Sequence, residues 1–201
     1  MNDEVADAES IAYFGRMPVQ ASHRFSVTDY YRLAEIGVLR HDARVELLDG
    51  QIFDLFPVSP LHAAVTRQIA QPFLELPEER CIVSIHNPVR LNEFSEPEPD
   101  MALLKYRADY YKTHHPGPDD VLLLIEVADI SLDYDRDKLP IYGRAGIAEV
   151  WIVNLVDQTI ENYREPQFTG YQSKAVLRSG DKARPEAFPS IAVDVAELLK
   201  R

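Results

Sequence analysis

The chain has a single cysteine, few basic residues and no long apolar run. The lone Cys81 excludes an intrachain disulfide and a cysteine-rich zinc site, and we interpret it as a buried thiol in the apolar strand sequence Cys81-Ile82-Val83. The absence of a stretch of about 18 apolar residues excludes a typical transmembrane helix. The first residues are acidic where a secretory signal is basic and then apolar, so we expect a cytoplasmic protein.

Basic residues are outnumbered, with 21 Lys and Arg against 33 Asp and Glu, which gives a net charge of −12. Nucleic-acid affinity comes largely from Lys and Arg that neutralise phosphates, so this balance argues against a general DNA-binding module. It argues less strongly against a nuclease. A metal-dependent site needs local carboxylates, and the bound cation reverses the field where the scissile phosphate lies.

The length indicates one domain. At 201 residues, 46% of them hydrophobic, the chain can bury one sizeable core. Residues 1–22 lack sustained periodicity, and we interpret them as a mobile arm that can pack on a partner subunit. The expected domain is therefore residues 23–201.

Helical and strand patterns alternate along this domain. The pair Asp49-Gly50 is typical of a two-residue hairpin turn, Gly37 should end the first helix, and Pro72 should kink or shorten the second. Predicted helices span about 26–36, 61–76, 133–145 and 193–199, and predicted strands span 44–48, 51–55, 81–85, 89–91, 100–104, 121–127, 150–154, 160–163 and 171–177.

Three of these predictions determine the fold class. The run 121–125 is continuously apolar, as in a strand covered on both faces. Segment 133–145 has the length of a crossover helix, so the strands before and after it should pair in parallel. The alternation after residue 154 predicts an antiparallel meander. We therefore expect an α/β fold with a mixed (α+β) sheet, flanking helices and a C-terminal β meander.

Acidic residues lie where strands are predicted. Asp100 begins one predicted strand, and Glu126 follows the apolar run of another. A buried carboxylate is costly unless it is compensated, and Mg²⁺ is a natural partner because it prefers carboxylate and water oxygens. We therefore predict a Mg²⁺ site, open also to Mn²⁺, at Asp100 and Glu126. Glu46 lies between Val45 and Leu47 and should face the opposite side from both, where it can support the metal or a water.

A lysine should complete this site. Lys138 lies early in the predicted crossover helix, from which its side chain can lean back over the end of the strand that carries Glu126. An ammonium there can stabilise charge that develops on a phosphate. Tyr142, one helical turn later, shares the same face and can touch substrate or orient the lysine.

The sequences VELLDGQI, SPLH, EPEPDMALL, LLLIEVADIS and DRDKLPIYGRAGIAEVWIVN, in this order, resemble the Uma-two family of restriction-endonuclease-like proteins. That family is assigned to the PD-(D/E)XK nuclease superfamily. The resemblance implies a restriction-endonuclease-like core, a Mg²⁺-dependent endonuclease acting on DNA, and a homodimer. It carries the catalytic positions onto Glu46, Asp100, Glu126 and Lys138, and a recurrent histidine onto His62, which would position a water or another side chain.

Two departures from the family pattern bear on activity. Ala128 stands where the superfamily usually has its lysine, two residues after the second acid, so Lys138 must act instead. Pro140 interrupts the crossover helix. Because proline is tolerated only in the first helical turn, we expect that helix to begin within about four residues before it, with residues 129–134 as a loop.

Other interpretations remain open. Ala128, Pro140 and the net charge favour a non-catalytic binding or assembly module that keeps the fold, and the acidic surface suits a hydrolase of a small phosphorylated ligand. Individual residues also have ordinary structural interpretations. These are a turn aspartate for Asp100, an exposed hairpin residue for Glu46, an ion pair with Asp135 or Glu149 for Lys138, a helix-start or core histidine for His62, and a core aromatic for Tyr142.

Overall fold

The structure is a computed structural model that describes residues 22–40 and 42–200. Nearly all of the expected arm, residues 1–21, lies outside the described residues. The helices are α1 (Val27–Glu35), α2 (Pro60–Leu74), α3 (Leu132–Asp137), α4 (Leu139–Ala145) and α5 (Val195–Leu198), with 3₁₀ turns η2 (Glu78–Arg80) and η3 (Pro118–Asp120). The strands are β1 (Val45–Leu48), β2 (Gln51–Asp54), β3 (Ile82–Ile85), β4 (Met101–Leu104), β5 (Val121–Ala128), β6 (Glu149–Asn154), β7 (Thr159–Gln167), β8 (Gly170–Leu177), β9 (Lys182–Ala183) and β10 (Val193–Asp194).

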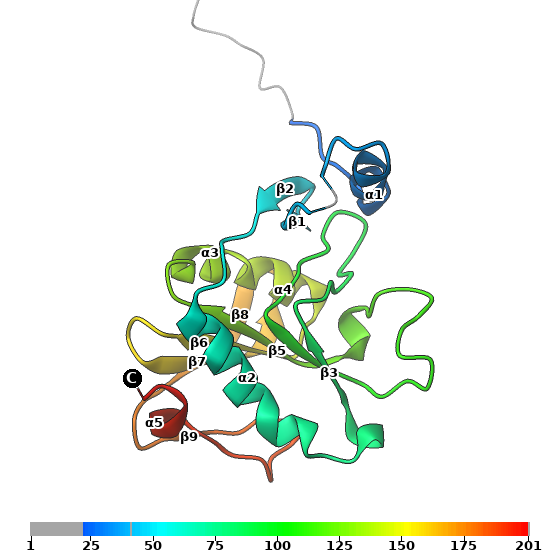
Figure 1. Cartoon of the computed structure of the whole chain (residues 1–201). Coiled ribbons are helices and arrows are strands. Elements are labelled where there is room, and N and C mark those ends of the chain that lie inside the picture. Colours follow the sequence, from blue (N-terminus) through cyan, green and yellow to red (C-terminus); the bar gives the residue numbers. More distant parts are fainter. Residues whose placement is uncertain (1–21, 41, 201) are drawn as a thin grey trace, which may run out of the picture.

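A six-stranded mixed sheet in the order β3-β4-β5-β6-β7-β8 forms the centre of the molecule (Figure 1). Only β5 and β6 pair in parallel within it, and all its other neighbours are antiparallel. The predicted crossover and C-terminal meander are thus confirmed. The hairpin β1-β2 and helix α1 lie together at one end of the molecule, and α5 lies at the other (Figure 1).

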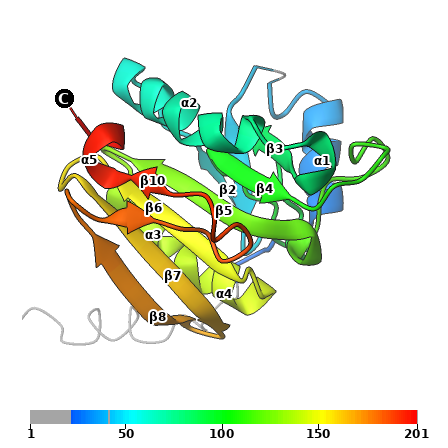
Figure 2. The same cartoon turned by 90° about the horizontal axis from the view of Figure 1, so that it is seen from below.

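Helices cover both faces of the sheet, as the view from below shows (Figure 2). Along β5, Leu123, Ile125 and Val127 belong to the core that contains α2 and α5. Leu124 and Ala128 belong to the core on the opposite face, with α4. Because successive side chains of a strand alternate, Glu126 faces the α4 side. Burial on both faces explains why this strand is apolar at every position except Glu126.

The structure confirms the local sequence signals for the hairpin turn and for the starts of the first two helices. Ser26 caps α1, and the turn residues Asp49 and Gly50 have positive φ angles of 49° and 82°, which suits a tight hairpin. Ser59 caps α2 through the His62 N–H. Pro72 falls in the last turn of α2, which ends at Leu74, two residues short of the predicted end.

The predicted helix 133–145 is two helices, because the chain breaks at Lys138 between α3 and α4. The expected loop over 129–134 is wrong, since α3 already begins at Leu132. Pro140 lies in the first turn of α4, where its missing N–H costs no helical bond. Lys138 is the C-cap of α3 and the N-cap of α4, one residue before the first helical turn in which it was expected.

Two further predictions are wrong in part. No strand forms at 89–91 within the described chain, where Val89 instead donates its N–H to the Pro97 carbonyl in a buried loop. The predicted terminal helix 193–199 is shorter, because its first residues pair with β9 as strand β10. Cys81 is a buried free thiol beside β3, as expected. In the described part of the chain, no helix is both long and apolar enough to cross a bilayer.

Helix α4 passes very close to the turn between β7 and β8. A Cβ atom on Gly143 would lie 2.1 Å from the Gly170 carbonyl oxygen and 2.6 Å from that of Gln167. Both atoms belong to the backbone and cannot rotate away. Only glycine allows this approach.

We predict that Gly143→Ala lowers the free energy of unfolding by about 1–3 kcal/mol or more, because the helix must move off the turn. Urea denaturation measures this. Gly117→Ala is the matched control, since a Cβ there meets its nearest atom at 3.8 Å. Equal stability of the two variants would contradict the close approach.

Candidate active site

The antiparallel pairing of β4 and β5 places the two predicted metal ligands side by side. Met101 pairs with Ile125, so Asp100 and Glu126 are the next neighbours along the ladder. The Asp100 N–H donates to Oε2 of Glu126 at 3.3 Å, and the Val127 N–H donates to Oδ2 of Asp100 at 2.7 Å. Each carboxylate is thus held by the backbone of the other's strand.

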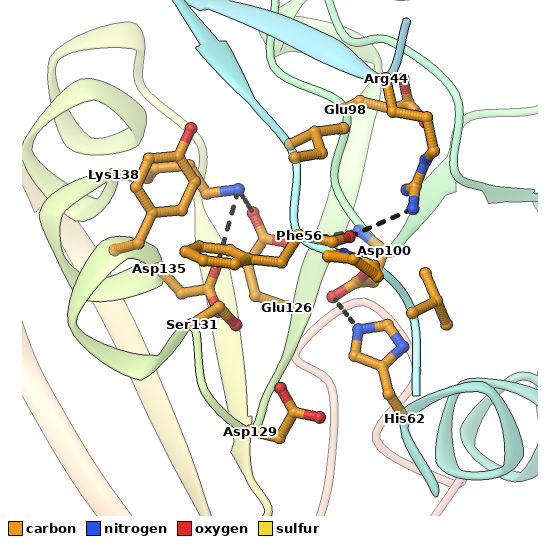
Figure 3. A pocket seen from close by; sticks show the side chains of 14 residues that line it. Arg44, Phe56, His62, Glu98, Asp100, Glu126, Asp129, Ser131, Asp135 and Lys138 are labelled. Carbon is orange, nitrogen blue, oxygen red and sulfur yellow. Dashed lines mark hydrogen bonds and ion pairs between the residues drawn. The ribbon is translucent and has the colours of Figure 1, made fainter. Parts of the chain in front are cut away.

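Lys138 lies at the centre of the site, with only 3% of its side chain exposed (Figure 3). Its Nζ atom is 2.7 Å from Oε1 of Glu126, 3.4 Å from Oε1 of Glu46 and 3.6 Å from Oδ1 of Asp135. The break between α3 and α4 turns its side chain back toward β5. Lys138 therefore joins the candidate site as predicted, and Asp135 joins it as well.

Glu46 is completely buried and fixed by three donors. Besides Lys138, it accepts the Glu98 N–H at 2.8 Å and the Tyr134 hydroxyl at 2.7 Å. The Tyr134 ring also lies 5.4 Å from the Lys138 ammonium. The side chain of Glu46 thus holds the lysine in place, and it is not an exposed hairpin residue.

Tyr142 also acts on a carboxylate. It is fully buried in the core beside α4, and its hydroxyl donates to Oε1 of Glu126 at 2.5 Å. It does not line the cavity described below. Its hydroxyl bonds the same Glu126 oxygen that Lys138 contacts, so its burial and this bond favour the predicted role of orienting the lysine over contact with substrate.

Two histidines flank Asp100. Nε2 of His62 is 3.1 Å from Oδ2, and Nδ1 of His86 is 3.5 Å from Oδ1. The two imidazole rings stack with centroids 6.1 Å apart. His86 was not predicted, although its position follows from strand register. It comes directly after Ile85, which pairs with Met101.

Several of these groups, among them Asp100, Glu126 and Lys138, line a cavity of about 50 Å³ that opens to solvent (Figure 3). Five carboxyl residues line it against two Lys or Arg residues. The lining residues are Arg44, Leu55, Phe56, Pro57, Val58, His62, Glu98, Asp100, Glu126, Asp129, Ser131, Tyr134, Asp135 and Lys138.

The buried carboxyl groups titrate unusually. Burial, with the charges of Asp135, Asp100 and Glu46, raises the pKa of Glu126 to about 8. Burial likewise raises the pKa of Asp135 to about 6. Asp100 differs, because its bond to His62 and the Val127 N–H outweigh burial and lower its pKa. Asp100 is therefore the acid best fitted to stay ionised.

The surroundings of Lys138 favour its charged form. Burial opposes its charged form, but the surrounding acids, Glu126 first among them, raise the pKa of Lys138 well above its usual value. Lys138 is therefore an ammonium ion at neutral pH. One such charge faces Glu46, Asp100, Glu126 and Asp135, so the site carries an excess of acidic groups.

The donor chemistry fits a hard divalent cation. Asp100 and Glu126 supply carboxylate oxygens, and two carboxylates with water form a usual Mg²⁺ shell. Among the residues that the structure describes, no three His, Cys, Asp or Glu side chains are arranged as a metal cluster. Lys138 contacts the Oε1 atom of Glu126. The fit is therefore that of two protein ligands.

All six predicted site residues lie in this one network. The prediction missed Arg44 and Tyr134, which reach the site from distant segments, and it treated Asp135 only as a surface partner for Lys138. The spacing of three residues between Asp135 and Lys138 was the available signal.

We predict that stability falls as pH rises from about 5 to 8 without divalent ions, by an amount on the order of a few kcal/mol. The folded-state pKa of Glu126 is about 8 against an ordinary 4.5, so its proton stabilises the fold at low pH and is lost through this range. Glu126→Gln should flatten the dependence in urea denaturation.

Glu161→Gln is the control for this measurement. The pKa of Glu161 is lowered to about 2, so it is ionised throughout the range and its loss should shift stability equally at every pH. Parallel curves for the wild type and Glu126→Gln would show that Glu126 does not hold a proton.

We further predict that Lys138→Met destabilises the fold by about 3–5 kcal/mol at neutral pH, because it leaves buried acids without a counter-charge. Thermal and urea unfolding measure this. The control is Lys174→Met, which removes a 43% exposed lysine side chain that forms an ion pair with Glu161. The free energy of unfolding should fall by only about 1 kcal/mol. A loss no larger than in this control would contradict the compensating role of Lys138.

Comparisons with known proteins give the same family as the sequence motifs, and a similar fold. The model of the Uma2 (Uma-two) family, described as "Putative restriction endonuclease", matches residues 27–196. No curated protein matches the chain. A solved structure of a "putative nuclease" of the DUF820 family from Anabaena variabilis is 13% identical, with a TM-score of 0.70 over 87% of this chain and 97% of that one. At this identity the likeness shows a shared fold. Since the family match spans most of the sequence, the chain belongs to the Uma2 family.

Proposed function

We propose that this protein is a Mg²⁺-dependent endonuclease that hydrolyses phosphodiester bonds of DNA, with Mn²⁺ as an alternative ion. The supporting observation is the cluster of Asp100, Glu126 and Lys138, in which the ammonium lies 2.7 Å from Glu126 at the edge of a solvent-open cavity. Membership of a family described as restriction endonucleases points to the same chemistry.

Asp100 and Glu126 would hold the ion. When bound, it supplies a Lewis acid for the phosphoryl oxygen and lowers the pKa of a water. Both ligands are fixed before any ion arrives. The Val127 N–H and His62 hold Asp100, and Tyr142 holds Glu126. Such fixed ligands reduce the cost of ordering the site on binding.

Lys138 would act on the phosphate. It stays protonated because Glu46, Asp135 and Glu126 surround it. An ammonium on a flexible stem can follow the negative charge that grows on the phosphate oxygens in the transition state. Ala128, fully buried at the end of β5, leaves no lysine on that strand. The lysine at the helix break is therefore the residue that we propose for this role.

One observation favours the non-catalytic alternative. In this conformation Lys138 Nζ already contacts Oε1 of Glu126, so the protein satisfies its own buried acid. A relative that keeps the fold only for binding or assembly would need no more than this. Metal binding separates the two possibilities, because the alternative gives the site no use for a divalent ion.

We predict that the wild type binds Mg²⁺ or Mn²⁺ in calorimetric titration and cleaves a mixture of single- and double-stranded DNA in its presence. Asp100→Asn should lower cleavage at least about 100-fold and remove metal binding, since it deletes one of two anionic ligands. Asp137→Asn, an exposed aspartate outside the cavity, is the control and should behave as wild type. Undiminished cleavage by Asp100→Asn would overturn the site.

A further inference from the structure

The cavity is too small to hold a nucleotide. Its 50 Å³ has space for a few water-sized groups, such as an ion with water or phosphate oxygens. The sugar and base beside a scissile phosphate must therefore stay outside, against the rim. The side chains of that rim decide which form of nucleic acid can present its phosphate to Asp100 and Glu126.

One wall of the rim is apolar and exposed. It is formed by residues 55–58, the connection between β2 and α2, all of which line the cavity. Phe56 is 46% exposed and Val58 is 38% exposed, which is unusual for such side chains next to a buried acidic cluster. The edge-to-face contact of Phe56 with Tyr134, with ring centroids 6.1 Å apart, holds the ring in position. Figure 3 shows Phe56 between Lys138 and Asp135 on one side and Asp100 and His62 on the other.

A single exposed cation accompanies this wall. Of the two Lys and Arg residues that line the cavity, Lys138 is buried and Arg44 is exposed. Arg44 donates to the Phe56 carbonyl oxygen at 3.3 Å, which places its guanidinium against the backbone of this wall. A duplex carries two rows of phosphates, and binding it takes several cations. The lining offers one exposed cation and five carboxyl residues.

We propose that the site acts on single-stranded DNA, with the base next to the scissile phosphate stacked on Phe56 and that phosphate contacted by Arg44. Bases of a duplex are already stacked on one another, whereas an unpaired base gains a partner on an aromatic ring whatever its identity. This substrate class rests on the proposed nuclease function. It adds a stacking residue and a phosphate contact that the acidic cluster does not provide.

The test measures binding and cleavage separately. A fluorescently labelled strand of mixed sequence, alone or annealed to its complement, is titrated with protein by fluorescence anisotropy in Ca²⁺, which takes the same oxygen ligands. Cleavage of the same strands is followed in Mn²⁺. The variants are Phe56→Ala and Phe56→Trp, which keeps an aromatic face. The control is Phe168→Ala, which removes the 77% exposed phenylalanine of the β7-β8 turn, outside the cavity lining.

The single strand should bind more tightly than the duplex. Phe56→Ala should weaken single-strand binding about tenfold, with Phe56→Trp and Phe168→Ala close to wild type. Tighter duplex binding, or an unchanged Phe56→Ala, overturns the single-strand inference even if DNA is cleaved. Binding that depends on Phe56 without any cleavage supports it and overturns the nuclease proposal. Absence of both binding and cleavage overturns both.

Discussion

The ion contacts of one buried lysine organise this part of the molecule. Lys138 is the counter-charge for Glu46, Glu126 and Asp135, which arrive from the hairpin, the central strand and helix α3. Each of these elements would otherwise bury a carboxyl group without a counter-charge, which is costly in an apolar interior. The packing of three separate segments therefore depends on the charge of this one lysine. The same balance leaves an acidic excess, which supports the proposal that a divalent cation binds here.

The sheet topology supplies the geometry for this balance. Antiparallel pairing of β4 and β5 sets Asp100 beside Glu126, and the parallel crossover from β5 to β6 brings a helix back over the same strand. In a continuous helix, the helical repeat alone would set the direction of the Lys138 side chain. The break at Lys138 changes the direction of the chain there, and Pro140 makes that break compatible with a new first turn.

Features that depend on residues close together in the sequence could be predicted, whereas contacts between distant segments could not. The hairpin, the crossover and the meander follow from local periodicity, and the family motifs locate Asp100, Glu126 and Lys138 without coordinates. The strand expected at 89–91 fails because a strand needs a neighbour, and Val89 finds only a loop carbonyl. His86 was missed because its contact with Asp100 appears only once the register of β3 on β4 is known. Such pairings between distant segments carry no local periodic signal.

The close backbone approach of α4 to the β7-β8 turn limits where this site can adapt. Gly143 contacts the carbonyl groups of that turn with no room for a methyl group, so α4 cannot move closer to the meander. Tyr142, the neighbour of Gly143, is held by its hydroxyl bond to Glu126. A larger residue at position 143 would push α4 away from the turn and so disturb the helix that carries this tyrosine.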